Sequence, residues 1–155
     1  AQGGVNFMIA EKLGLTNVQF LQPLHNQEGG SGIMGSLPHP MTVPHFLQMV
    51  KDSFGIESLM HNATTQQTIQ RVALCGGAGD FLLDTAISQG ADAFLTGEMS
   101  YHRYFGHEDE VLIGVMGHYQ SEKFTIQLLH RILHEAHPSL RIEETEVDTN
   151  PIHIN

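Results

Sequence analysis

The amino-acid sequence predicts an α/β fold, with a mixed, largely parallel sheet flanked by helices. The first observation is a regular alternation from Arg71 onward, where short apolar runs at 71–75, 93–95 and 111–116 are separated by helical patterns. The second is that glycines and helix-capping residues follow these runs, as they do at the ends of strands and helices. The third is the composition: 155 residues, 41% apolar and 15% charged, are enough for one core of ordinary size.

The amino-terminal half is predicted to hold two helices and a connecting loop. Apolar residues at helical spacing predict the helices, which Gly14 and Gly55 end. Period-two alternation predicts a short strand, and a stretch rich in Gly, Ser, Asn and Pro predicts a loop at the boundary between two lobes. In order, these elements are a helix (3–15), a strand (18–24), the loop (25–40), an amphipathic helix (42–55) and a short strand (58–60).

The carboxyl-terminal half is predicted to alternate strands with helices. Its elements are a strand (71–75), a helix (80–90), a strand (93–95), a short helix (100–106), a strand (111–116), a long helix (119–137) and an edge-like strand (140–147). Pro138 stops the long helix. In such a sheet, ligands bind at the carboxyl ends of the strands. Those ends carry the sequences CGGAGD, TGE and GHYQSE, so three polar segments are expected at one sheet edge.

Composition argues against several classes of partner. A formal charge of -10 argues against a sequence-independent grip on nucleic acid. No apolar run approaches the ~20 residues that a membrane span needs, so no membrane partner is expected. Cys75 is the only cysteine, which makes the reducing cytoplasm the default compartment. Because it ends an apolar run, Cys75 is interpreted as a core residue and not as a nucleophile.

The first polar segment is Gly76-Gly77-Ala78-Gly79-Asp80. Glycines between a strand and a helix expose backbone N–H groups that suit a phosphate or another anion, so Gly76, Gly77 and Gly79 are candidate ligand-binding residues. The alternative is a tight turn that permits close packing of strand and helix. Asp80 favours the turn, because its carboxylate would repel an anion.

The second polar segment is Thr96-Gly97-Glu98, with His102 four residues further on. Glu98 is a candidate general base, a partner that orients another ligand, or a metal ligand itself. His102 is a candidate catalytic residue that shares the proton of Glu98 or stands behind it. The alternative is a helix start at which Glu98 favours the dipole and His102 lies on the surface.

The third polar segment holds His118 and Glu122. Their i, i+4 spacing places an imidazole and a carboxylate on one helix face, a pair that suits zinc, manganese or iron(II). The alternative is a solvated or capping pair. Two ligands do not hold a metal alone, and the candidates for the others are Glu98, His102, His107 and Asp80. His130 and His134 have the same spacing, which more often marks a polar face.

These segments together resemble the NIF-three-like family, whose members are often called GTP cyclohydrolase I type 2 homologues. The family pattern runs from an apolar strand into CGG-x-G, then GAD-x-x-x-TGE with a nearby His, then GH-x-x-(S/T)-E. The chain supplies each piece in order, strongly over residues 71–133. Residues 35–54 resemble the family's Gly-x-Leu-x-x-Pro-Met-(S/T) lead into a helix, and Asn150-Pro151-Ile152 also resembles the family.

The resemblance implies a NIF-three-like fold and a site for two divalent metal ions between two lobes, in a ring-shaped homo-oligomer, commonly a hexamer. His118 and Glu122 match the ligands of the carboxyl-terminal lobe. The family's other ligands are a His-His pair, which this chain lacks, and an Asp ahead of a helix that Gly3-Gly4-Val5-Asn6 matches. We therefore interpret residues 1–34 as a remnant of the amino-terminal lobe with its loop, and residues 35–155 as the α/β lobe. The last helix and strand are expected to pack back on the first lobe.

Two functions follow from this interpretation. The first is a divalent-metal-dependent hydrolase of a nucleotide or another phosphorylated small molecule, with Glu98 accepting a proton. The second is a non-enzymatic metal-binding ring that acts as a scaffold or metal chaperone. Because the chain has only two matched ligands, we expect it to hold no stable dinuclear centre by itself. A third interpretation takes CGGAGD as a nucleotide-binding loop.

Overall fold

The computed structural model describes residues 1–25 and 28–152. Six strands form one sheet in the order β1-β2-β4-β5-β6-β3. The helices are α1 (Val5–Lys12), α2 (Val43–Phe54), α3 (Leu83–Ser88), α4 (His118–Glu122) and α5 (Thr125–Ala136), with 3-10 turns η1 (Asp80–Leu82) and η2 (Tyr101–Tyr104). The strands are β1 (Thr16–Pro23), β2 (Gly30–Thr42), β3 (Met60–His61), β4 (Thr68–Cys75), β5 (Ala93–Thr96) and β6 (Leu112–Val115). The mixed α/β fold is confirmed.

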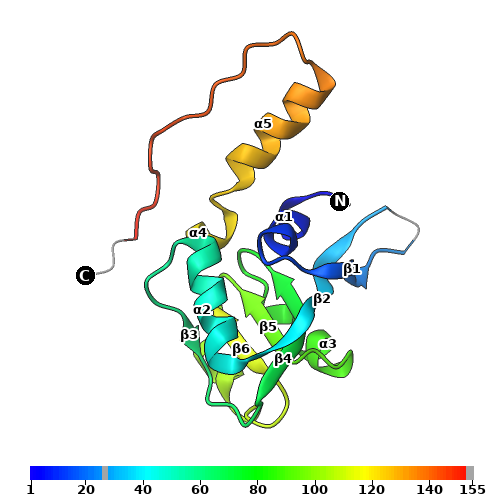
Figure 1. Ribbon diagram of the computed structural model, residues 1–155, viewed down its shortest axis with the longest axis vertical. Coiled ribbons are helices and arrows are strands. Elements are labelled where there is room, and N and C mark those ends of the chain that lie inside the picture. The colour runs from blue at the N-terminus through cyan, green and yellow to red at the C-terminus, as the bar shows by residue number, and fades with distance from the viewer. Residues whose placement is uncertain (26–27, 153–155) are drawn as a thin grey trace.

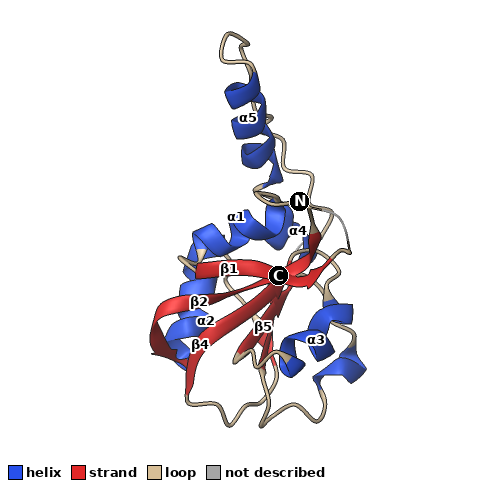
Figure 2. Cartoon of the chain, turned by 90° about the vertical axis from the view of Figure 1, so that its right-hand side faces the viewer, coloured by secondary structure: helices blue, strands red, loops and turns tan. Residues whose placement is uncertain are grey.

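Helices cover both faces of the sheet (Figures 1 and 2). On one face, α1 and α2 bury residues such as Ile9 and Phe46 against Val72 and Leu95. On the other face, η1 and α3 bury Leu82, Leu83 and Ala86 against residues such as Phe94. Because β4, β5 and β6 are covered on both sides, their sequences read as continuous apolar runs and not as alternating ones.

The parallel part of the sheet comprises β4, β5 and β6. Cys75 pairs with Thr96, and Thr96 pairs with Val115, so the three strands end in register. The pairs β1–β2, β2–β4 and β3–β6 are antiparallel. The register brings the segments that follow the three parallel strands to one edge of the sheet, as the sequence predicted.

The predicted loop at 25–40 is wrong over most of its length, because residues 30–42 form β2. This strand pairs with β1 on one side and with β4 on the other. Its glycines serve close packing: a Cβ on Gly35 would lie 3.1 Å from the Thr16 carbonyl oxygen. A register shift between Ser36 and Met41 accommodates the two prolines of this stretch. Residues 26–27 lie outside the described part, and the division at residue 34 stays a prediction.

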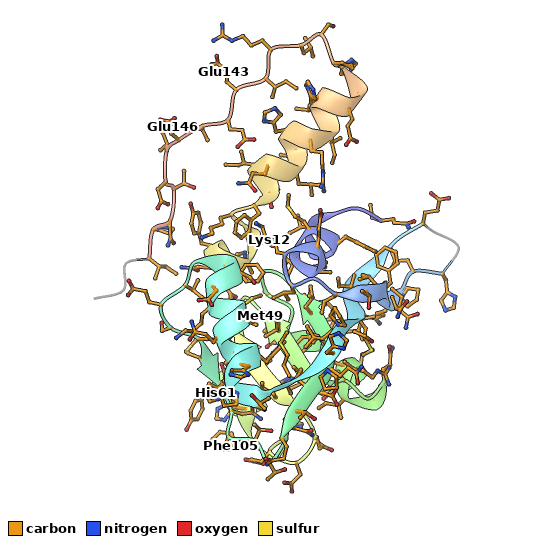
Figure 3. All side chains as sticks on the ribbon, viewed as in Figure 1. Lys12, Met49, His61, Phe105, Glu143 and Glu146 are labelled. Atoms are coloured by element: carbon orange, nitrogen blue, oxygen red, sulfur yellow. The ribbon has the colours of Figure 1, made fainter. Side chains whose placement is uncertain are left out.

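The predicted helix at 119–137 is divided into α4 and α5. The Thr125 hydroxyl donates to the Glu122 carbonyl at 2.7 Å, and Lys123 and Phe124 form the turn between the helices. The Phe124 ring packs edge-on against Phe54, and Lys12 Nζ lies 3.6 Å from its centroid. Figure 3 shows Lys12 reaching from α1 toward this junction. Residues 118–136 therefore form two separate helices instead of one.

Helix α5 projects away from the sheet, and a tail of residues 137–152 returns from its end toward α4 (Figure 1). Only Leu128 of α5 is buried. The predicted strand at 140–147 is wrong, because this segment pairs with no strand in the described residues. Glu143 and Glu146 mark its course in Figure 3. Within the described ranges, every helix is too short or too polar to cross a membrane.

Candidate functional site

The three strand-end segments meet at Gly77. Its N–H donates to the Ser121 hydroxyl oxygen at 3.0 Å, which links the loop after β4 to α4. Its carbonyl oxygen accepts from the Glu98 N–H at 3.0 Å and from the Thr96 hydroxyl at 3.3 Å, which links the same loop to β5. The edge of the sheet is thus one hydrogen-bonded unit.

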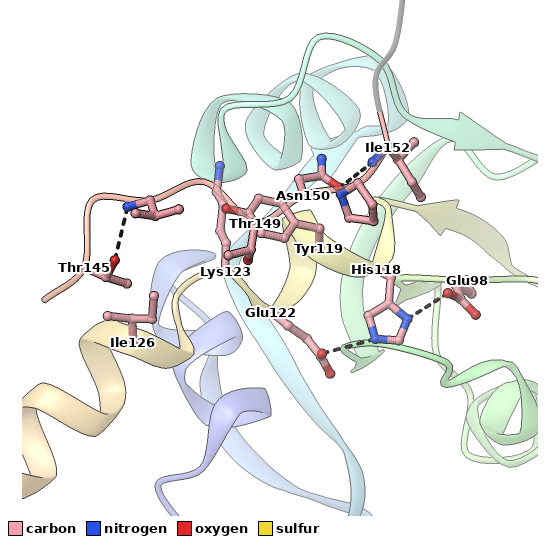
Figure 4. Close-up of a pocket in the computed structure, with 12 residues that line it drawn as sticks. Glu98, His118, Tyr119, Glu122, Lys123, Ile126, Thr145, Thr149, Asn150 and Ile152 are labelled. Carbon is pink, nitrogen blue, oxygen red and sulfur yellow. Dashed lines mark hydrogen bonds and ion pairs between the residues drawn. The ribbon is translucent and has the colours of Figure 1, made fainter.

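His118 lies between two carboxylates on this edge (Figure 4). Gly117 adopts a φ of 95°, and α4 begins at the next residue. The Nδ1 atom of His118 is 2.7 Å from Glu98 Oε1, and Nε2 is 3.2 Å from Glu122 Oε2. All three side chains are roughly half exposed, so the cluster is open to solvent and to ligands.

The two carboxylates favour the imidazolium form of His118. The hydrogen bond that His118 Nδ1 donates to the Glu98 carboxylate is the largest cause that raises the pKa of His118, and the charge of Glu122 adds to it while partial burial opposes it. A metal ligand must be a neutral imidazole. A metal ion at His118 would therefore compete with a proton, and its binding would weaken as the pH falls through the raised pKa.

Replacing Glu98 with glutamine is expected to lower the pKa of His118 toward its ordinary value of about 6.5. The raised pKa of the folded state stabilises the fold below the unfolded-state pKa, and this contribution disappears as the pH rises through the raised value. Glu98→Gln should reduce that acid-side stabilisation. Two-dimensional NMR of the ring nitrogens measures the titration. Glu110→Gln is the control, because Glu110 pairs with His107; an unchanged His118 titration in Glu98→Gln would contradict the assignment.

The backbone N–H groups of the glycine loop are occupied by side chains of the protein. Gly76 donates to Asn6 Oδ1 at 2.9 Å, and Gly79 donates to Thr96 Oγ1 at 3.1 Å. With the bond from Gly77 to Ser121, each of the three candidate anion donors has an internal acceptor. This bonding favours the tight turn over an anion site.

The other candidate ligands have different neighbours. The His102 ring packs edge-on against Tyr101, and His107 Nδ1 lies 2.8 Å from Glu110 Oε2. Asp80 accepts from the Ser100 hydroxyl at 2.9 Å. None of the three lines the cavity at His118, so the structure joins Glu98 to His118 and Glu122 but leaves the others apart.

Cys75 and the histidines of α5 also take structural contacts. The half-buried Cys75 packs against the core, and burial is the main cause that raises the pKa of its thiol. This agrees with a packing residue, because a thiol with a raised pKa is a poor nucleophile. On α5, His130 Nδ1 lies 2.6 Å from Glu144 Oε1 on the tail, while the His134 ring centroid is 6.3 Å from that of His130.

A cavity of about 470 Å³ opens beside His118, and the tail forms one of its walls. Sequence reasoning missed this wall, which includes Thr145, Val147 and Asn150. The tail is fastened to α4 by a hydrogen bond between Tyr119 and Asp148, which raises the pKa of Tyr119. The cavity combines an apolar wall with the polar cluster at its end (Figure 4).

The donors at this edge fit part of a metal site. His118 Nε2 and Glu122 Oε2 face one another, and Glu98 holds the opposite ring nitrogen, as carboxylates do behind metal-bound histidines. Over residues 1–25 and 28–152, no group of three or more His, Cys, Asp or Glu side chains is placed to hold a metal ion. A bound ion would need further ligands from water or from another protein segment.

Comparison with known proteins places the chain in a family. Residues 1–151 match the model of the family described as Duf34/NIF3 (NGG1p interacting factor 3). The chain belongs to this family. A relative from Lactococcus lactis, named GTP cyclohydrolase 1 type 2 homolog, is 33% identical over 97% of this chain and 58% of its own length. One of the same name from Streptococcus pneumoniae is 30% identical, over 98% of this chain and 60% of its own length.

Solved structures show the same fold as this member of the NIF3 family. A hypothetical protein from Staphylococcus aureus superposes with a TM-score of 0.84 at 22% identity, covering 99% of this chain and 64% of that one. A Bacillus cereus protein related to NIF3 has a TM-score of 0.79 at 17% identity, covering 100% of this chain and 70% of that one. At these identities the likeness concerns the fold. The chain spans about 60% of the length of these curated relatives.

Proposed function

We propose that this chain supplies His118 and Glu122 to a divalent metal site of a hydrolase that acts on a nucleotide or another phosphorylated small molecule. The observation that carries the proposal is the arrangement of His118, with one ring nitrogen held by Glu98 and the other facing Glu122. Zinc, manganese or iron(II) suits such a pair, with two ions in the complete site. The metal would supply Lewis acidity and lower the pKa of a bound water.

The protein's own residues orient the site. Glu98 keeps a proton on His118 Nδ1, which leaves Nε2 as the ligand atom of the neutral ring. The tail and α4 form the cavity in which a small substrate is held beside this atom. Both Glu98 and Glu122 are acidic and the glycine N–H groups are occupied, so the positive charge for a phosphate group would come from the metal and from Lys123, which lines the same cavity.

The experiment measures phosphate release and base release from nucleotides by the complete natural protein with Mn²⁺ or Zn²⁺. Glu122→Ala is expected to abolish turnover, because it removes one of the two ligand side chains. Glu110→Ala is the matched control, since Glu110 pairs with His107 and does not line the cavity. Turnover that survives Glu122→Ala at the wild-type rate would contradict the hydrolase.

The second candidate is a non-enzymatic metal-binding ring, commonly hexameric, that acts as a scaffold or metal chaperone. The occupied glycine N–H groups favour it, because they leave no backbone cradle for a phosphate. Metal uptake and a ring-sized particle in light scattering, without turnover of any nucleotide tested, would support this function. A monomer that turns over nucleotides would contradict it.

A further inference from the structure

Two buried hydroxyl groups lie at the junction of the three strand-end segments. Thr96 and Ser121 are fully buried, and with Asn62 they make up the buried polar side chains among the described residues. A buried hydroxyl is costly unless it is hydrogen-bonded. Both hydroxyls form two hydrogen bonds, and each has one bond to Gly77.

Ser121 joins α4 to the loop after β4. Its hydroxyl donates to the His118 carbonyl at 2.8 Å and accepts from the Gly77 N–H at 3.0 Å. Ser121 lies between His118 and Glu122 on the same short helix, so this bond fixes the helix that carries both side chains. With the bond removed, the buried Gly77 N–H would lack its acceptor.

Thr96 joins β5 to the same loop. Its hydroxyl accepts from the Gly79 N–H at 3.1 Å and donates to the Gly77 carbonyl at 3.3 Å. The segments are closely packed: a Cβ on Gly97 would lie 2.7 Å from both the Gly77 carbonyl oxygen and Ser121 Oγ. Glu98 follows directly, and its own N–H bonds the Gly77 carbonyl.

We infer that Ser121 and Thr96 are positioning residues, which hold Glu98 at its hydrogen-bonding distance from His118 through their bonds to Gly77. Neither hydroxyl touches the cavity. They act by fixing the loop of Glu98 and the helix of His118 and Glu122 to one backbone unit. The expected effect of these hydroxyls on metal affinity rests on the proposed function. Their expected effect on the position of the His118 ring does not.

The test compares Ser121→Ala with Ser121→Thr and Ser88→Ala. Ser121→Thr retains the hydroxyl and is expected to restore wild-type behaviour. Ser88 makes a similar bond to a carbonyl three residues earlier, at 2.9 Å, but is exposed on α3, so its loss should change nothing at the edge. The measurements are the ring nitrogen shifts of His118 in the metal-free protein, and the dissociation constant of Mn²⁺ by calorimetry on the complete natural protein. Circular dichroism confirms folding.

Ser121→Ala is expected to shift the His118 ring resonances and to weaken Mn²⁺ binding by about 10- to 100-fold, as when a partner behind a metal ligand is removed. Resonances and affinity like those of the wild type would overturn the inference. A complete wild-type protein without Mn²⁺ affinity would count against the proposed function, and the ring resonances alone would then decide the inference. If Ser121→Ala fails to fold, the nearly isosteric Thr96→Val takes its place, with Thr96→Ser as the hydroxyl-retaining control.

Discussion

If the proposed metal site is correct, replacing Gly77 with alanine in the complete natural protein is expected to weaken Mn²⁺ binding by about 10- to 100-fold. A Cβ at this position would lie 2.6 Å from Glu122 Oε1 and 3.5 Å from His118 Cε1. Because the closest atom is the end of a flexible side chain, the carboxylate would move away while the fold stays intact. The φ of 64° adds backbone strain of about 1–2 kcal/mol for a residue with a Cβ.

Gly14→Ala is the control that separates the contact of the new Cβ with Glu122 from the backbone strain of a positive φ. Gly14 has a φ of 65°, nearly the same as Gly77, but a Cβ there would meet no atom within 4 Å. Both variants should lose similar stability in urea unfolding followed by circular dichroism, which suits a chain without tryptophan. Only Gly77→Ala should lose metal affinity. Equal Mn²⁺ dissociation constants for the two variants would contradict the proposed contact between Gly77 and the ligand pair.

The glycine loop therefore has a different role from the one its sequence first suggests. Glycines between a strand and a helix are typical of anion sites. Here they allow side chains from two other segments to approach the backbone, and Gly77 lies directly under Glu122. Glycine suits both an anion site and close packing, because the missing Cβ permits close approach by a phosphate or by a carboxylate of the protein. The hydrogen-bond partners distinguish the two cases.

The fold was predictable where its signals are local. Continuous apolar runs gave β4, β5 and β6, because these strands are buried on both faces. Strand β2 was missed because its glycines and prolines predict a loop, while the reason it is extended lies in its partners, β1 and β4. Conversely, residues 140–147 have the composition of an edge strand but have no strand beside them in the described part. Strand formation depends on a neighbour that composition does not reveal.

The site was predictable only in part, because some of its contacts are local in the sequence and others join distant segments. The i, i+4 spacing of His118 and Glu122 is local, and the structure does bring the two side chains within 3.2 Å. The contact of His118 with Glu98 depends on the register of β5 and β6, which places the two segments side by side. The role of Ser121 depends on a bond to Gly77, 44 residues earlier. Nothing in the residues around Ser121 indicates that partner.

Asn62 supports the same sheet from its outer side. It is buried, and its amide group donates to the Val111 carbonyl at 3.0 Å and accepts from the Ile113 N–H at 2.8 Å. It thereby supplies hydrogen bonds that a longer β3 would have made to β6. Asn62 thus bonds the start of β6, and the other end of this strand leads to His118 within a few residues.

Replacing Asn62 with alanine is expected to lower the free energy of unfolding by about 2–4 kcal/mol, because two buried backbone groups each lose a partner. Gln66→Ala is the matched control. Gln66 also bridges to two carbonyl groups of the segment before β6, but at 3.4 Å and near solvent, so its loss should cost less than about 0.5 kcal/mol. Urea unfolding measures both variants. Equal losses of unfolding free energy in the two variants would show that burial of the Asn62 amide does not determine how much it stabilises the fold. Water would then replace the amide as the hydrogen-bond partner of β6.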